Sequence, residues 1–221
     1  MATDEFTGFT DETLAFLSGL KANNARAWFD ENRKTYEAAV KAPAKAFSEV
    51  MAGELERLTS AAHKPKIFRI NRDLRFSKDK TPYNTHVHIS WLPAAGGDGA
   101  PAFMFGLSPE YCTVGCGLFE FPGPMLETYR ETIAGAGGDD LGRTIDELTE
   151  DGFRVSDPAL KRLPASFPAD HPRAGLALHK GLVLWHDFDS PQAATEPDIM
   201  ARCLGHFERL LPFRRFLSTL A

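Results

Sequence analysis

The sequence predicts an α+β protein in which a largely antiparallel sheet, built as a meander, is packed by N-terminal and C-terminal helices. Three observations carry this prediction. Apolar residues recur at helical spacing over residues 10–61, they alternate as in strands beyond Lys64, and helical spacing returns near the C-terminal end. Short connections between the expected strands favour antiparallel pairing. A parallel, doubly wound sheet would contradict the prediction.

Residues 10–61 are expected to be helical. Thr10 has the side chain of an N-cap and precedes DETLAFLSGLK, whose leucines recur at near-helical spacing. NARAWFDENRKTYEAAV, residues 24–40, predicts one second helix with aromatic and apolar residues four apart. Pro43 is typical of a first helical turn and predicts the start of a third helix.

Residues 64–121 are expected to be rich in strands. Apolar and polar residues alternate here, and turn residues such as PAAGGDGAP separate the alternating runs. In the last run, Gly115 and Gly117 predict a bulge or a close approach of two backbones. The expected strands are KIFRI (66–70), THVHISWL (85–92), PAFMFGLS (101–108) and YCTVGCGLF (111–119).

Residues 122–175 are expected to hold one helix followed by loops. The helix is GPMLETYRETIAG, residues 123–135, whose apolar residues have helical spacing. The overlapping glycine-rich stretch AGAGGDD, residues 134–140, predicts a flexible loop. A looser stretch rich in glycine, aspartate and proline continues to the end of this region.

Residues 176–221 are expected to hold a strand and the C-terminal helices. GLVLWHDF, residues 181–188, is typical of a buried strand, and residues 196–220 have helical spacing that Pro212 is expected to kink or divide. We predict a single domain over residues 1–221, because this length with 43% hydrophobic residues supports one large core.

Composition argues against several classes of protein. The formal net charge of −5 disfavours a chain that coats nucleic acid or an anionic membrane over its whole surface. Residues 1–9 do not read as a signal peptide, and no segment approaches about 18 consecutive apolar residues, so we expect no membrane contact and a cytoplasmic location. Cys112, Cys116 and Cys203 are expected to be reduced, structural thiols.

The sign of the charge is inverted between Lys64 and His86. This segment holds seven basic and two acidic residues, a net charge of +5, while the rest of the chain carries −10. Crowded like charges destabilise a fold unless a counter-ion is present, so the segment predicts an anionic ligand. The basic residues are Lys64, Lys66, Arg69, Arg72, Arg75, Lys78 and Lys80.

One arginine of this segment is expected to face apolar neighbours. If the first strand continues to Phe76, then Phe68, Ile70, Leu74 and Phe76 share one face, and Arg72 falls on that face. A guanidinium buried there needs a carboxylate or a bound anion, because burying it unpaired is expensive.

The end of the segment combines cations, hydroxyls and a ring in one turn, and arginine forks match the paired oxygens of phosphate or carboxylate. We predict that a small phosphate- or carboxylate-bearing molecule binds here. One hypothesis is that the protein is an enzyme acting on this molecule. Arg72, Arg75 and Lys78 are expected to bind the anion rather than only support the fold. The predicted ligand-binding residues are Arg69, Arg72, Arg75, Ser77, Lys78, Lys80 and Tyr83. The predicted bases are Asp73 and Asp79.

Two alternatives stay open. The segment can be a docking surface for a nucleic-acid backbone or an acidic partner protein, with Tyr83, Trp91 and Phe76 as stacking groups. It can also be a purely structural lattice of ion pairs. The acidic remainder of the chain favours the small ligand, because backbone tracking needs a broader positive stripe. We therefore expect no general nucleic-acid binding.

A metal site is a further alternative, because His86 and His88 share one face of an expected strand. Their spacing matches no strong metal signature, and the sequence contains no GxSxG, phosphate-loop or dinucleotide fingerprint. We therefore predict no metal and no cofactor. The later residues that a metal site would need are among His171, His179, His186, Asp187 and Asp189.

Four stretches together resemble a widespread bacterial and fungal family of conserved hypothetical proteins, DUF2461. They are LKANNARAWFDENRKTYE, RINRDLRFSKDKTPYNTH, VGCGLFEFPGPMLETYRETI and LKRLPASFPADHP. The resemblance implies no activity, but it adds Trp28, Tyr36 and Arg130 to the predicted ligand-binding residues. Asn84 stands where the family often has a lysine, which shortens the reach of any basic groove. The family's recurrent positions correspond here to Asn24, Trp28, Phe29, Tyr36, Arg69, Arg72, Asp73, Arg75, Phe76, Ser77, Lys78, Asp79, Lys80, Pro82, Tyr83, Gly117, Arg130 and Pro164.

Overall fold

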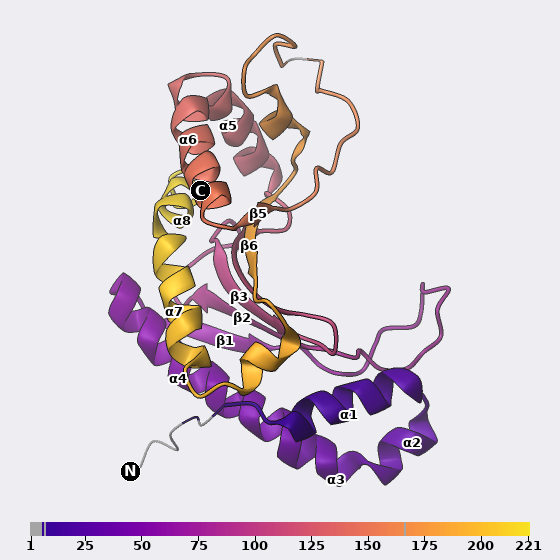
Figure 1. The fold of residues 1–221 in the computed structure, drawn as a ribbon. Helices are drawn as coiled ribbons and strands as arrows, with labels where there is room; N and C mark the ends of the chain where they lie inside the picture. The colour runs from indigo at the N-terminus through magenta and orange to yellow at the C-terminus, as the bar shows by residue number, and fades with distance from the viewer. Residues whose placement is uncertain (1–5, 7, 166) are drawn as a thin grey trace. The chain divides into compact units, whose positions relative to one another are not determined.

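The fold is an α+β arrangement, as predicted (Figure 1). The computed structural model describes residue 6, residues 8–165 and residues 167–221. Within these residues, six strands form one antiparallel sheet in the order β1-β2-β3-β4-β6-β5. The strands are β1 (His63–Ile67), β2 (Val87–Pro93), β3 (Ala102–Leu107), β4 (Cys112–Leu118), β5 (Arg154–Val155) and β6 (Leu182–Asp187).

Helical segments precede, interrupt and follow the strands, and the chain packs as two compact units. The first comprises Met1–Trp91, Met104–Val114 and Asp187–Gly205, and the second comprises Leu92–Phe103, Gly115–His186 and His206–Ala221. The single domain stays a prediction. The helices are α1 (Asp11–Ala22), α2 (Arg26–Glu31), α3 (Arg33–Thr35), η1 (Tyr36–Lys41), α4 (Ala42–Thr59), α5 (Gly123–Ile133), α6 (Ala136–Glu150), η2 (Ala174–Leu178), η3 (Pro191–Thr195), α7 (Ile199–Arg209) and α8 (Leu211–Ser218).

In the first unit, α4 packs against β1 and α1 packs against η1. Aromatic rings fill the core between these helices and the sheet. Phe47 lies 4.7 Å from Phe105 and 5.9 Å from Trp91, measured between ring centroids, and Phe9 stacks on Phe105. Trp91 also donates a hydrogen bond from Nε1 to the Ser48 carbonyl (2.9 Å). This core supports β2, the strand that follows the charged segment of residues 64–86.

The prediction of one continuous helix over residues 24–40 is wrong. The chain breaks at Asn32, whose side-chain amide donates to the Trp28 carbonyl (2.8 Å), and then passes through the π-helical turn η1 into α4. Pro43 lies in the first turn of α4 and has no amide hydrogen for the Ala39 carbonyl. That carbonyl instead accepts a hydrogen bond from Thr13 Oγ1 (2.6 Å), which ties α1 to the turn.

The first strand also differs from its prediction. It begins at His63 and ends at Ile67, so the continuation to Phe76 is wrong. The Phe68 amide still donates to the His88 carbonyl (2.9 Å), but no strand is assigned between Ile67 and Val87. Ile70 is buried but Phe76 is 94% exposed, so these two residues do not share an apolar face. The three strands predicted next correspond to β2, β3 and β4.

In the second unit, the two glycines of β4 allow the close backbone approach that the sequence predicted. A Cβ atom on Gly117 would lie 2.1 Å from the Leu182 carbonyl oxygen, and one on Gly115 would lie 2.7 Å from that of Leu184. The predicted strand over residues 181–188 is present as β6. The two-residue β5, which pairs with β6, is too short to show alternation in the sequence.

The prediction of a flexible loop at residues 134–140 is wrong, because α6 begins at Ala136. Leu141, Ile145 and Leu148 are buried at helical spacing, but the glycines before them hid the start of the helix. The predicted division at Pro212 is confirmed, since α7 ends at Arg209 and α8 begins at Leu211.

Burial agrees with the role expected for the cysteines. Cys112, Cys116 and Cys203 are free and buried. Burial raises the pKa of Cys112 and Cys116 to about 12, so these thiols stay protonated at neutral pH. In the described part of the chain, no helix has both the length and the apolar character needed to cross a membrane.

Candidate functional site

The charged segment, residues 64–86, comprises most of β1 and the connection from β1 to β2. Tyr83 anchors this connection to the helices. The Tyr83 amide donates to Asn24 Oδ1 (3.0 Å), and Asn24 Nδ2 donates to the Tyr83 carbonyl (2.9 Å). The Tyr83 ring stacks on Phe29 with 4.2 Å between centroids and is only 6% exposed. Tyr83 is therefore a buried anchor in this structure.

The two ends of the segment pair with each other to form a neck. Asn71 and Tyr83 form an isolated antiparallel bridge. The Arg72 amide donates to the Pro82 carbonyl (3.0 Å), and the Asn84 amide donates to the Ile70 carbonyl (2.7 Å). Residues 73–81 are therefore a loop that projects from a paired neck.

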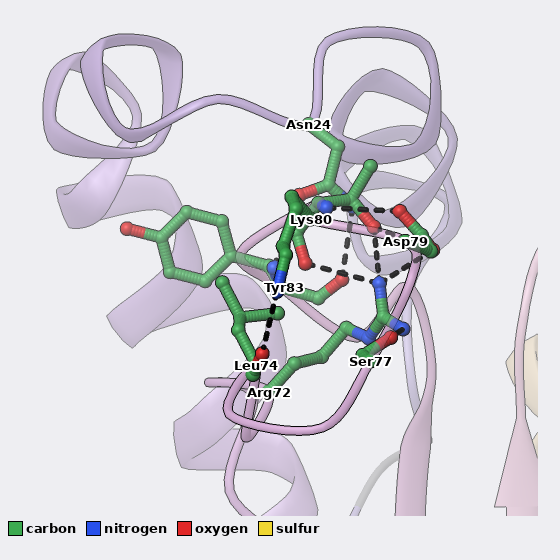
Figure 2. A network of polar contacts seen from close by, with 8 residues as sticks. Asn24, Arg72, Leu74, Ser77, Asp79, Lys80 and Tyr83 are labelled. Atoms are coloured by element: carbon green, nitrogen blue, oxygen red, sulfur yellow. Dashed lines mark hydrogen bonds and ion pairs between the residues drawn. The ribbon is translucent and has the colours of Figure 1, made fainter.

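Arg72 holds this loop closed from within (Figure 2). Its Nη1 donates to Asp79 Oδ2 (2.6 Å), to the Thr81 carbonyl (3.0 Å) and to the Thr81 hydroxyl, and Nη2 donates to Ser77 Oγ (3.4 Å). The Thr81 amide, the Thr81 hydroxyl and Arg72 together lower the pKa of Asp79. This network has the form expected of a structural lattice.

Two further contacts stabilise the loop. Arg75 forms a two-pronged ion pair with Asp73, with Nη2 2.6 Å from Oδ2 and Nε 3.0 Å from Oδ1. Lys80 donates from Nζ to the Leu74 carbonyl (3.0 Å; Figure 2). Arg75 lowers the pKa of Asp73, so both predicted bases are held as weakly basic carboxylates. A catalytic role for either aspartate stays a prediction.

The outer side of the loop presents an exposed aromatic ring among cations. Phe76 is almost fully exposed, and the Arg75 guanidinium carbon lies 5.9 Å from the centroid of its ring. Lys78 is exposed and makes no ion pair or hydrogen bond with any residue that the structure describes. These side chains are accessible to a partner.

A pocket of about 290 Å³ lies beside the neck, within the first unit. It contains three of the predicted site residues, Arg69, Arg72 and Asp73, whereas Ser77, Lys78, Lys80 and Tyr83 do not line it. Its other walls were not predicted as binding groups. The full lining is Phe68, Arg69, Asn71, Arg72, Asp73, Asn84, His86 and His88.

Two stacked histidines, one just before β2 and one in it, form one wall of this pocket. The rings of His86 and His88 lie 3.8 Å apart between centroids, and His88 Nε2 lies 2.8 Å from the Tyr111 hydroxyl oxygen. Burial lowers the pKa of His86, and burial together with His86 lowers that of His88 to about 4. Both imidazoles are therefore neutral near pH 7 in this environment.

The model of a family described as a conserved hypothetical protein (DUF2461) matches residues 12–216. The chain belongs to this family. No curated protein matches the chain.

Among the positions added by the DUF2461 resemblance, Trp28 and Tyr36 belong to an aromatic cluster in the helical part of the first unit. Phe16 lies 5.5 Å from Trp28 and 5.7 Å from Tyr36, measured between ring centroids, and Phe29 lies 5.2 Å from Tyr36. Neither residue lines the pocket. They support Phe29, on which Tyr83 stacks.

Arg130 is placed in α5, in the second unit. Its Nε is buried and has no hydrogen-bond partner among the described residues. Within those residues, no three His, Cys, Asp or Glu side chains are grouped so that they could hold a metal ion. His86 and His88 form a pair, and His179 and His186 lie in the second unit.

We expect Arg72→Met to lower the free energy of unfolding by about 1.5–3 kcal/mol, because hydrogen bonds to its charged group are lost and Asp79 keeps no cation partner. The Arg72 side chain is 24% exposed. The control is Arg75→Met, whose side chain is 77% exposed and whose ion pair with Asp73 is solvated, so only a small change is expected. Denaturant unfolding monitored by circular dichroism measures both. Equal losses in the two variants would contradict this assignment.

Proposed function

We propose that this DUF2461 protein binds a small phosphate- or carboxylate-bearing molecule in the pocket beside the neck. The observation that supports this most directly is Arg69, which lines the pocket and makes no ion pair with any described residue. The other two arginines of the charged segment, Arg72 and Arg75, are already paired with Asp79 and Asp73. An unpaired guanidinium matches the paired oxygens of an anion.

The rest of the lining supports the same ligand class. Asn71 and Asn84 bring side-chain amides to the pocket, and the two imidazoles add ring nitrogens. Asn84 Nδ2 donates to the Arg69 carbonyl (3.1 Å), which fixes the backbone at Arg69. The surrounding segment carries +5 in an otherwise acidic chain, so its field attracts anions toward the pocket.

A reaction on the bound anion is the finer part of the proposal. Asp73 lines the pocket, but its ion pair with Arg75 makes it a weak base. His86 and His88 are the other proton-transfer groups of the pocket, but burial lowers the pKa of both imidazoles, so they accept a proton near pH 7 only when a bound anion favours the imidazolium.

The proposal is tested by titrating the protein with sulfate, inorganic phosphate and citrate by isothermal titration calorimetry, alongside thermal unfolding. A ligand that binds only the folded state raises the unfolding midpoint by mass action. We expect Arg69→Met to weaken binding by about 10- to 100-fold, the equivalent of one charge-assisted contact. The matched control Lys78→Met removes an exposed cation that does not line the pocket and should weaken binding only slightly.

Two results would contradict the proposal. The first is that none of these anions binds or raises the unfolding midpoint. The second is that Arg69→Met binds as tightly as the wild type, which would exclude the pocket as the site.

One observation favours the runner-up, a docking surface for an acidic partner protein. Phe76 is exposed beside Arg75 and Lys78 on the outer side of the loop. Of the three predicted stacking groups, Tyr83 and Trp91 are buried and cannot stack on a partner, so only Phe76 is exposed. A single ring is a poor platform for successive bases, so nucleic acid is the weaker partner. If Lys78→Met loses affinity for an acidic protein or peptide while Arg69→Met keeps it, this docking surface would be supported.

A further inference from the structure

The protonation state of the stacked histidines determines how much positive charge the pocket presents to an anion. His86 lies just before β2 and His88 lies in it, and their two rings stack with 3.8 Å between centroids. Burial keeps both rings neutral near pH 7. Two neutral imidazoles contribute no net charge toward an anion.

Among the described residues that line the pocket, only one positive charge lacks a carboxylate partner, and Lys78 and Lys80 of the loop do not line it. Arg72 is balanced by Asp79 and Arg75 by Asp73, which leaves Arg69. A dianion placed beside Arg69 would therefore carry one uncompensated negative charge into a partly buried site, which is unfavourable. Protonation of one imidazole would remove that imbalance.

Only one of the two rings can become charged at a time. Two imidazolium cations with centroids 3.8 Å apart would repel each other strongly in a partly buried site. The pair therefore titrates as a unit that can hold a single proton when an anion is bound, rather than as two independent groups. One proton added to the charge of Arg69 matches two negative charges.

Resting on the proposed function, we propose that the ligand carries a dianionic phosphoryl-type group, and that its binding transfers one proton from solvent to the His86–His88 pair. The dianion supplies the favourable charge interaction that burial denies to the imidazolium. No other bond forms or breaks. A carboxylate monoanion, which Arg69 alone balances, would bind without this proton.

Tyr111 lets His88 accept the proton without losing a hydrogen bond. Neutral His88 Nε2 can accept from the Tyr111 hydroxyl, and once protonated it can donate to the same oxygen. Burial raises the pKa of Tyr111, so the hydroxyl stays protonated throughout. Glu110, the neighbouring carboxylate, is engaged by Lys21.

The other charged groups of the pocket do not compete for the proton. Arg75 lowers the pKa of Asp73, so this carboxylate stays ionised near neutral pH. Arg69 and Arg72 are already cations. The proton taken up therefore reports on the histidine pair.

The experiment is calorimetric titration of the full chain with sulfate near pH 7, in Pipes, Mops and Tris. The slope of the observed enthalpy against the ionisation enthalpy of the buffer counts the protons taken up. Sulfate is a dianion that does not protonate in this range, so the protein must be the acceptor. We expect uptake of about one proton per sulfate bound, and tighter binding as the pH falls, by up to about tenfold per pH unit. Acetate should bind without uptake.

The double substitution of His86→Asn and His88→Asn should abolish proton uptake, whereas His171→Asn in the second unit should retain it. If the double variant does not fold, histidine ring resonances of the wild type decide the question, because two of them should shift on addition of sulfate. Sulfate binding without proton uptake would overturn this inference and leave the proposed function standing. Failure of every anion to bind would overturn both. Equal proton uptake with acetate would overturn the dianion assignment.

Discussion

Tyr83→Ala is expected to lower the free energy of unfolding by about 3–5 kcal/mol, the range for truncating a buried aromatic side chain. The ring is almost fully buried and stacks on Phe29, with planes only 19° apart. Its removal leaves a cavity between the charged segment and the helices. Denaturant unfolding of the variant measures the loss.

The matched control is Tyr83→Phe, which keeps the stacked ring. The Tyr83 hydroxyl makes no hydrogen bond to any described residue, so its removal should change stability by no more than about 0.5 kcal/mol. The sequence predicted Tyr83 as a ligand-binding residue instead. If Tyr83→Ala keeps full stability and loses only sulfate affinity, the ligand-binding role is correct and the anchor is wrong.

Gly117→Ala is expected to destabilise the protein by about 3–5 kcal/mol, from backbone strain together with a steric clash. Gly117 has a φ of +145°, a conformation that residues with a side chain rarely adopt. The added Cβ would lie 2.1 Å from the Leu182 carbonyl oxygen on β6. Backbone atoms meet there, so no side-chain rotation relieves the contact.

Gly205→Ala is the control for this substitution. Gly205 lies within α7, and a Cβ added there would meet nothing within 4 Å. Alanine favours the helix by roughly 0.5–1 kcal/mol over glycine, so this variant should be slightly more stable than the wild type. Thermal and denaturant unfolding of the two variants should therefore move in opposite directions. If Gly117→Ala leaves the free energy of unfolding unchanged, β4 and β6 can separate slightly at little energetic cost.

The long periodic elements could be predicted because each carries its own pattern. The helices at residues 11–22 and 123–133 bury one side of an amphipathic run, and the strands β2, β3 and β4 are apolar runs buried along most of their length. Both kinds of run are visible in the sequence. The break at Asn32 and the start of α6 were missed. At Asn32 the apolar spacing continues although the backbone dihedrals leave the helical range, and at α6 a run of glycines concealed the periodic signal.

For the candidate site, the sequence by itself determined that residues 64–86 carry inverted charge and hold arginine, lysine and hydroxyl groups suited to an anion. Only the tertiary structure decided how these groups are used. The neck brings Asn71 against Tyr83, so the loop folds back and Arg72 turns inward onto Asp79 and Thr81. The same fold makes a pocket from both sides of the neck. Periodicity reports the side on which a residue lies, but it does not report which distant residues face it, and this is why the histidine pair joined the site only in the folded chain.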